Sequence, residues 1–299
     1  MDRPSHEPDL RVAALLARCS FPPAGAAVNC AVSGGADSLA LLVLAVEAGC
    51  SVTAIHVDHG LRAGSAAEAD IVAAASARFG AQFRRERIEL AAGPNLEARA
   101  RAARYDALPD DVLLGHTADD QAETILINLL RGAGVGGFTG MRREARRPLL
   151  DLRRHETHEL CAALDLEAID DPMNHDPSFT RVRVRHELLP LLDDIAARDL
   201  VPVLCRQAAL AADAVDALDT LTDSLDAADA RALAAAPVAL ARWAARRWLR
   251  AETGSDHPPS AAALDRVLDV ARGRSVATEI EGGWRVARSH NRLHVTMAR

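Results

Sequence analysis

The sequence predicts an α/β fold with a parallel sheet in residues 1–200, followed by a smaller domain in residues 201–299 that is mostly or entirely helical. Strand-like and helix-like segments alternate through the first half, a pattern typical of parallel sheets covered on both faces. After about residue 200 the composition changes to Ala, Asp and Leu at helical spacing. A length of 299 residues is sufficient for two such domains.

The elements of the first domain follow one another in a regular order. Strands are expected at residues 28–32, 52–57, 83–90 and 112–115, and helices at residues 39–45, 68–79, 95–108, 118–130, 156–164 and 181–192. The third strand contains Arg84, Arg85 and Arg87, which favour an edge position. Because parallel sheets bind ligands at the carboxyl ends of their strands, the loops that follow the strands are the first places to search for a site.

A serine- and glycine-rich turn joins the first strand to the first helix and predicts an anion site. Its residues are Ser33, Gly34, Gly35, Ala36, Asp37 and Ser38. The glycines let a phosphate approach the backbone N–H groups, and the helix start adds donors and partial positive charge. The alternative is a plain turn in which Asp37 or Ser38 caps the helix. The pattern S-G-G-x-D-S resembles the pyrophosphate-binding PP-loop of ATP pyrophosphatases, and no Lys follows it as in a Walker loop.

Composition excludes several classes of protein. The chain contains no lysine, so its 35 basic residues are all Arg and no Schiff-base or P-loop lysine is present. The net charge of −7 means that nucleic-acid binding would need local Arg clusters. The five cysteines are scattered and are expected as small core residues. The polar start and the lack of a long apolar run predict a cytoplasmic protein with no membrane partner.

The loop after the second strand offers further polar groups. We expect the backbone near His56 to contact adenine, and the side chains of His59 and Arg62 to face phosphate or ribose. A polar turn after a strand is common and indicates little alone. Its position one strand after the anion turn is what favours a nucleotide site.

Two carboxylates lie at the start of the helix expected over residues 118–130. Thr117 is a good N-cap, and Asp120 and Glu123 then project from one face at i and i+3. Beside a phosphate site, such a pair suits a bound amine or Mg²⁺. The alternative is that these acids only stabilise the positive end of the helix.

Five glycines in residues 131–141 predict a mobile loop, and two Arg clusters follow it. The first cluster contains Arg142, Arg143, Arg146, Arg147, Arg153 and Arg154. The second, interleaved with Trp243 and Trp248, contains Arg242, Arg246, Arg247 and Arg250. Both could contact phosphates, and the alternative for each is an ordinary solvated surface.

Together these segments resemble one family, the tRNA(Ile)-lysidine synthetases of the PP-loop superfamily. The matching segments are residues 33–38, 56–62, 95–105, 115–124, 130–132, 140–141, 147–150, 171–174 and 181–190. Val182 departs from the family, which commonly has Asn there. The part after residue 200 carries no specific motif, but its length suits the helical second domain of a short family form.

The resemblance implies a parallel-sheet PP-loop (HUP-like) ATP-binding catalytic domain in residues 1–200 and a helical tRNA-binding domain in residues 201–299. It implies that ATP and Mg²⁺ are used to adenylate the C2 oxygen of the wobble cytidine in a tRNA(Ile) with a CAU anticodon. The ε-amine of free L-lysine then displaces AMP and forms lysidine. The assembly is left open between a monomer and a homodimer.

The resemblance also assigns the site. Its catalytic residues would be Asp37, Arg104, Asp120, Glu123, Arg181 and Arg185. Asp37 would contact Mg²⁺, the other two acids would hold lysine or Mg²⁺, and the arginines would stabilise charge that develops on phosphate and cytosine.

Three other interpretations stay open. A tRNA thiolase would use a cysteine pair or an iron–sulfur cluster, which the isolated cysteines disfavour. An amide-forming synthetase would want a glutaminase domain or an ammonia channel, and would not need the Arg clusters. An inactive nucleotide-binding module is disfavoured by the intact carboxylates at positions 37, 120 and 123.

Overall fold

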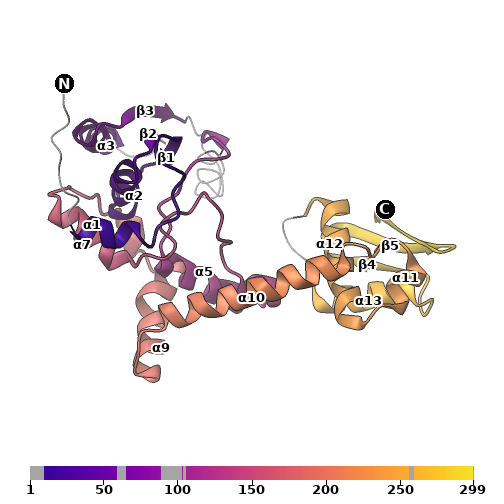
Figure 1. Ribbon diagram of the computed structural model, residues 1–299. Helices are drawn as coiled ribbons and strands as arrows, with labels where there is room; N and C mark the ends of the chain where they lie inside the picture. The colour runs from indigo at the N-terminus through magenta and orange to yellow at the C-terminus, as the bar shows by residue number, and fades with distance from the viewer. Residues whose placement is uncertain (1–9, 59–64, 89–102, 104–105, 256–258, 299) are drawn as a thin grey trace. The chain divides into compact units, whose positions relative to one another are not determined.

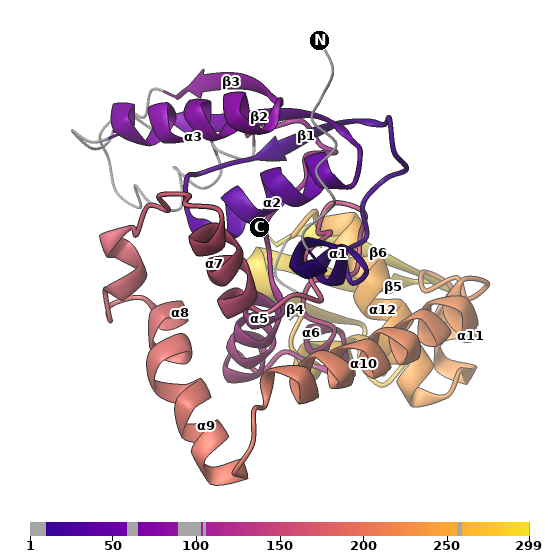
Figure 2. The same cartoon turned by 60° about the vertical axis from the view of Figure 1, so that its left-hand side comes forward.

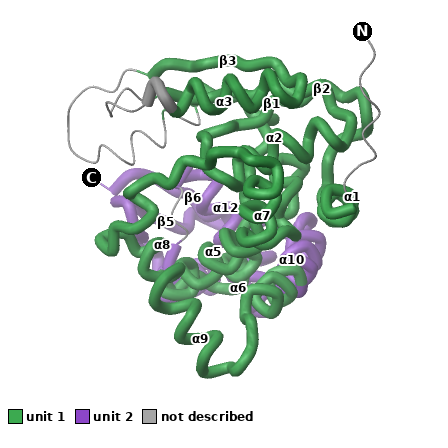
Figure 3. The backbone as a smooth tube through the Cα atoms, turned by 90° about the vertical axis from the view of Figure 1, so that its left-hand side faces the viewer, with its two compact units in different colours: residues 1–209 green, residues 210–299 purple. Residues whose placement is uncertain are grey.

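The computed structural model describes residues 10–58, 65–88, 103, 106–255 and 259–298 (Figure 1). The chain groups into two compact units, residues 1–209 and 210–299 (Figure 3). The division lies within helix α10 (Val201–Thr222), close to the boundary near residue 200 that the change in composition suggested. In the described part of the chain, no helix has both the length and the apolar character required to cross a bilayer.

Unit 1 is built on a parallel sheet, as the alternating pattern predicts, and its strand order is β1-β2-β3. Its strands are β1 (Ala27–Ala31), β2 (Ser51–Asp58) and β3 (Gln82–Arg87), connected by helices α2 (Ala36–Glu47) and α3 (Ser65–Phe79) (Figure 2). Leu39, Leu42 and Ala54 are fully buried in the core between the sheet and these helices. On the other face of β2, Ile55 packs with Leu108, so both faces are covered.

The expected fourth strand is reduced to a single bridge. Leu113 accepts a hydrogen bond from the N–H of Ala31 at 3.0 Å and donates one to the carbonyl of Asn29 at 2.8 Å. The N–H of the next residue, Leu114, points to the opposite side and donates to the carbonyl of Arg146 at 2.7 Å, as expected for alternate residues of an extended segment. The segment therefore lies beside β1, but it forms no extended strand. The expected helix over residues 95–108 lies largely outside the described residues.

Other helices among the described residues of unit 1 are α1 (Leu10–Leu16), α5 (Ala118–Leu130), α6 (Val135–Phe138), α7 (Arg154–Ala163), α8 (Thr180–Arg183) and α9 (Leu189–Ala196), together with the 3-10 helix η1 (Pro172–His175). A π-helical segment, η2 (Val184–Leu188), joins α8 to α9, so the helix expected over 181–192 has a wider turn at its centre.

The glycine-rich segment, predicted as a mobile loop, is anchored to α5. The amide of Gln121 donates to the carbonyls of Thr139 and Met141 at 3.2 and 3.0 Å and accepts from the N–H of Met141 at 2.7 Å. A Cβ on Gly140, whose φ is +58°, would lie 2.6 Å from the Gln121 oxygen. Glycine is thus required for the close approach, and α6 forms within this segment.

Unit 2 contains helices and a small antiparallel sheet. The helices are the end of α10, α11 (Ala230–Ala235), α12 (Val238–Thr253) and α13 (Ala261–Ala271), and the strands are β4 (Ala277–Ile280), β5 (Trp284–Ser289) and β6 (Arg292–Met297). Leu249, Leu264 and Val286 share its core. The mostly helical character is confirmed, and the sheet is an addition that the pattern of residues 284–297 could have indicated.

Candidate active site

The serine and glycine turn forms a closed cradle at the carboxyl end of β1. The Ser38 hydroxyl accepts from the N–H groups of Ser33 and Gly34 at 3.1 and 3.2 Å and donates to the Gly35 carbonyl at 2.8 Å. This hydroxyl therefore folds the turn back onto the start of α2. The first N–H groups of a helix have no partner within the helix, so the first turn of α2 suits an anion.

Two glycines allow this close packing. Gly34 has φ +94°, and a Cβ there would lie 2.4 Å from the Ile169 side chain. A Cβ on Gly115 would lie 2.7 Å from the backbone oxygen of Asp37. Gly115 thus lies against the backbone at the start of α2 with no room for a side chain, whereas Gly34 combines a positive φ with close contact to the Ile169 side chain.

Replacing Gly34 by Ala should therefore distort the cradle. The positive φ alone costs about 1–2 kcal/mol for an Ala, and the clash adds to it. We expect a lower thermal midpoint and a loss of ATP binding measured by calorimetry. Gly132→Ala is the matched control, because φ is +73° there but nothing lies within 4 Å of a new Cβ. Equal effects on ATP binding in both variants would contradict a specific role for Gly34.

His56 lies buried at the end of β2, beside the cradle. Its Nδ1 is 2.9 Å from the carbonyl of Val32, which can only accept, so Nδ1 carries the proton. Its Nε2 is buried, and among the described residues it has no hydrogen-bond partner. The predicted nucleotide contacts His59 and Arg62, and the predicted catalytic residue Arg104, lie outside the described residues.

The start of α5 places the predicted carboxylate pair at the site. Thr117 is the N-cap, and its N–H and hydroxyl donate to Asp120 Oδ2 at 2.9 and 3.0 Å. Asp120 is 8 % exposed and Glu123 is fully buried. Capping thus occupies one oxygen of Asp120 and leaves its other oxygen and the Glu123 carboxylate for other contacts.

Three guanidinium groups meet these carboxylates. Arg154 donates to Glu123 Oε1 and Asp120 Oδ1, both at 2.9 Å. Arg181 donates to Glu123 Oε2 at 2.7 Å and to Asp120 Oδ1 at 3.1 Å. Arg185 donates to Glu123 Oε1 and Oε2 at 2.7 and 3.2 Å. The predicted residues Asp120, Glu123, Arg181 and Arg185 are therefore brought together, with Arg154 among them.

Asp37 joins this cluster from the first turn of α2. Its carboxylate accepts a hydrogen bond from the Thr157 hydroxyl and lies 3.6 Å from Arg154 Nε. Burial and then the charge of Asp120 raise the pKa of Asp37, although Thr157 and Arg154 act in the opposite direction. Burial likewise acts to raise the pKa of Asp120, but the charges of Arg154 and Arg181 outweigh it and lower that pKa.

The donor set beside the cradle fits a magnesium nucleotide. Mg²⁺ is commonly held by one or two carboxylates together with substrate phosphates. Asp37 supplies one carboxylate at the position where the cradle would hold phosphate. The described residues contain no group of three or more His, Cys, Asp or Glu side chains that could hold a metal.

Most arginines of the first Arg cluster form ion pairs with carboxylates, although Arg143 remains largely exposed. Arg143 pairs with Asp151, Arg147 with Glu144, and Arg153 with Asp119 and Asp199. Sequence reasoning placed Arg154 in this cluster as a phosphate contact and missed its place among the site carboxylates. One signal in the sequence could have pointed to this role. Arg154 lies just before the predicted helix at residues 156–164 and shortly after the matched segment at residues 147–150.

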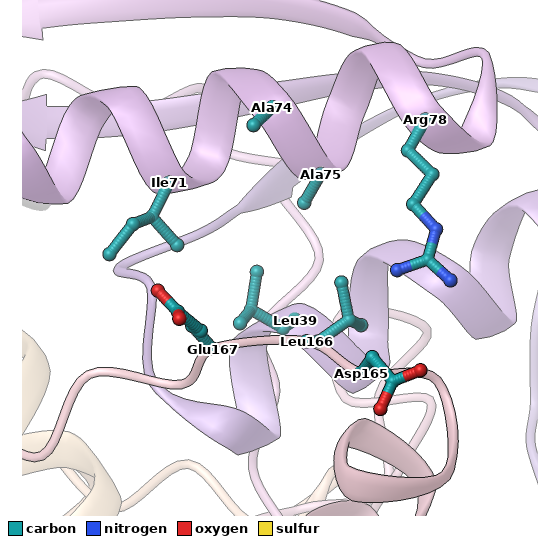
Figure 4. A pocket seen from close by; sticks show the side chains of 8 residues that line it. All are labelled: Leu39, Ile71, Ala74, Ala75, Arg78, Asp165, Leu166 and Glu167. Atoms are coloured by element: carbon teal, nitrogen blue, oxygen red, sulfur yellow. The ribbon is translucent and has the colours of Figure 1, made fainter.

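A separate pocket lies between α3 and residues 165–167, with Leu39 at its base (Figure 4). Its walls are largely apolar, and the Arg78 guanidinium donates to the Leu164 carbonyl at 2.6 Å. None of the cradle or cluster residues lines it, so it is not part of the candidate active site.

The cysteines lack the features of a sulfur-transfer site. All five are free thiols, and Cys30, Cys50 and Cys161 are buried. Burial raises the pKa of Cys30 to about 12 and that of Cys161 to about 11, so these thiols stay protonated at neutral pH. The thiolase alternative therefore gains no support.

Comparison with known proteins adds independent findings. Residues 9–192 match the PP-loop domain family. The chain is 41 % identical to a tRNA(Ile)-lysidine synthase of Nocardia farcinica, over 93 % of this chain and 94 % of that protein. A Corynebacterium glutamicum protein of the same name is 37 % identical over 90 % of both chains.

A solved structure resembles the chain in fold. A U34-tRNA thiolase from Methanococcus maripaludis, with its [4Fe-4S] cluster, aligns with a TM-score of 0.52 and 18 % identity over 67 % of this chain and 76 % of that chain. At this level of identity, the likeness concerns the fold alone.

Proposed function

Because this chain belongs to the tRNA(Ile)-lysidine synthase family of PP-loop ATP-dependent ligases, we propose that it joins free L-lysine to the wobble cytidine of a tRNA(Ile) with a CAU anticodon. One juxtaposition supports this function in particular. The phosphate cradle at the start of α2 and the buried acid pair of α5 lie on either side of Arg154, which contacts Asp37, Asp120 and Glu123. A nucleotide site and a site for a cationic amine thus adjoin each other.

The reaction has two steps. The cytosine C2 oxygen attacks the α-phosphorus of ATP, and pyrophosphate leaves with the bonding electrons. The lysine ε-amine then attacks C2, AMP leaves, and the amine loses a proton. The cradle would bind the pyrophosphate portion, and Asp37 would hold Mg²⁺, which neutralises phosphate charge when bound.

The acid pair would hold the lysine side chain. All four of its carboxylate oxygens accept hydrogen bonds in this structure, so an ammonium group would replace one of the arginine donors. The side chain of Arg181 is 37 % exposed and that of Arg185 is 24 % exposed, against 19 % for Arg154. Arg181 and Arg185 are therefore the donors that could turn toward phosphate or cytosine.

Unit 2 would contribute to tRNA binding through α12. Among the described residues, Arg242 pairs with Asp265 and Arg247 with Asp219 and Asp223, whereas no ion pair involves Arg246 or Arg250. We expect Arg246→Gln with Arg250→Gln to weaken tRNA binding and to lower the slope of log K against log salt by about 1.5 units. Arg242→Gln, which removes a paired arginine, should change the slope less. An unchanged slope in the double variant would remove α12 from the interface.

The function can be tested directly. The purified protein is incubated with tRNA(Ile) transcript, ATP, Mg²⁺ and isotope-labelled lysine, and the tRNA nucleosides are analysed by mass spectrometry. Cytidine should gain one lysine residue, with one AMP and one pyrophosphate released per product. A cytidine that gains sulfur, or ATP cleavage with no lysine incorporation, would reject the proposal.

A further inference from the structure

Arg154 stands at the first position of α7 and contacts carboxylates from two other helices. Its Nη1 and Nη2 donate to Glu123 and Asp120 of α5 at 2.9 Å each, and its Nε lies 3.6 Å from Asp37 of α2. Burial acts to lower the pKa of Arg154, but the three carboxylates outweigh it and raise that pKa, so the side chain is always charged. One planar group therefore spans both sides of the site.

Arg181 and Arg185, which also contact the acid pair of α5, differ from Arg154 in the carboxylates with which they form ion pairs. The ion pairs of Arg181 and Arg185 are made with Asp120 and Glu123. Within the described part of the chain, Asp37 makes an ion pair with Arg154 alone. Arg154 is thus the charged link between the nucleotide side and the amine side.

We propose that Arg154 is a positioning residue that fixes the amine-binding carboxylates of Glu123 and Asp120 relative to Asp37. This inference rests on the proposed function, since it assumes that these carboxylates hold lysine. A guanidinium presents its donors in a rigid planar fork, whereas a lysine ammonium is a single point charge and cannot hold all three carboxylates in the same arrangement. Geometry rather than charge alone is the property that the site requires.

The test compares variants at two adjacent arginines. Arg154→Lys keeps the charge without the fork, and Arg154→Met removes both. Arg153→Lys and Arg153→Met are matched controls, because Arg153 is similarly buried and pairs with Asp119 and Asp199 instead. We expect both Arg154 variants to raise the KM for lysine by roughly ten- to a hundredfold, while the KM for ATP changes less than about threefold. The controls should change neither value.

A double-mutant cycle then asks whether Arg154 acts through Glu123. If it does, Arg154→Met with Glu123→Gln should show a lysine KM no higher than that of Glu123→Gln alone. Additive losses, or a normal lysine KM in Arg154→Lys, would overturn the positioning role. If the Met variant does not fold, the Lys variant decides, and failure of both to fold would assign Arg154 to stability instead. Wild-type protein that makes no lysidine would reject the proposed function rather than this inference.

Discussion

Asp37→Asn should abolish most pyrophosphate release while leaving the fold at least as stable as before. The amide keeps the shape of the side chain but cannot serve as an anionic partner of Mg²⁺ beside the cradle. Loss of one preorganised electrostatic contact typically costs a hundred- to a thousandfold in rate, so we expect a fall of roughly that size. Release of labelled pyrophosphate from ATP in the presence of tRNA measures it.

The expected effect of Asp37→Asn on stability follows from the direction in which folding shifts the pKa of Asp37. Because folding raises this pKa, the ionised group costs stability once the pH exceeds its ordinary value, and the cost disappears as the pH falls below that value. At neutral pH, Asn removes the cost, so the thermal midpoint should stay the same or rise. Asp70→Asn on the exposed face of α3 serves as the control for both measurements. Normal pyrophosphate release by Asp37→Asn would refute the assigned role.

Of the variants proposed here, Glu123→Gln should lower the stability of the fold most. It should also weaken the binding of lysine. Glu123 is fully buried and accepts hydrogen bonds from three arginines, so the variant leaves an excess positive charge among them. Removing one member of a buried ion cluster costs about 3–5 kcal/mol. For a protein of this size, that corresponds to a thermal midpoint lower by roughly 6–20 °C in calorimetry.

The kinetic result separates the two steps of the reaction. If Glu123 holds the lysine ammonium, lysine affinity should fall by roughly ten- to a hundredfold and adenylated tRNA should accumulate when lysine is scarce. Rapid-quench assays with radiolabelled ATP follow the intermediate, at a temperature where the variant is folded. Failure of adenylation itself would move Glu123 to the metal side of the site.

Glu144→Gln is the control for the thermal midpoint. It breaks the exposed ion pair with Arg147 and should shift the midpoint by no more than about 2–3 °C.

Local patterns were sufficient to predict several elements of unit 1 and the turn proposed to bind phosphate. The apolar runs and their punctuation predicted β1, β2, α2 and α5, because the periodicity of a strand or a helix is visible within about ten residues. The capping of α5 by Thr117 and Asp120 was likewise readable, since an N-cap and its partner lie three positions apart. The reduction of the expected fourth strand to a bridge at Leu113 was not readable, because strand pairing depends on partners that are distant in the sequence.

The sequence by itself determined the order of the elements in unit 1, the turn at residues 33–38 and the identity of most charged residues of the candidate site. Only the tertiary structure decided which charges meet. Arg154 lies 31 positions from Glu123, and Thr157 lies 120 positions from Asp37, yet each pair is in hydrogen-bond contact. No local spacing encodes such contacts: they arise when α2, α5 and α7 pack together, and burial then makes each uncompensated charge costly enough to require a partner.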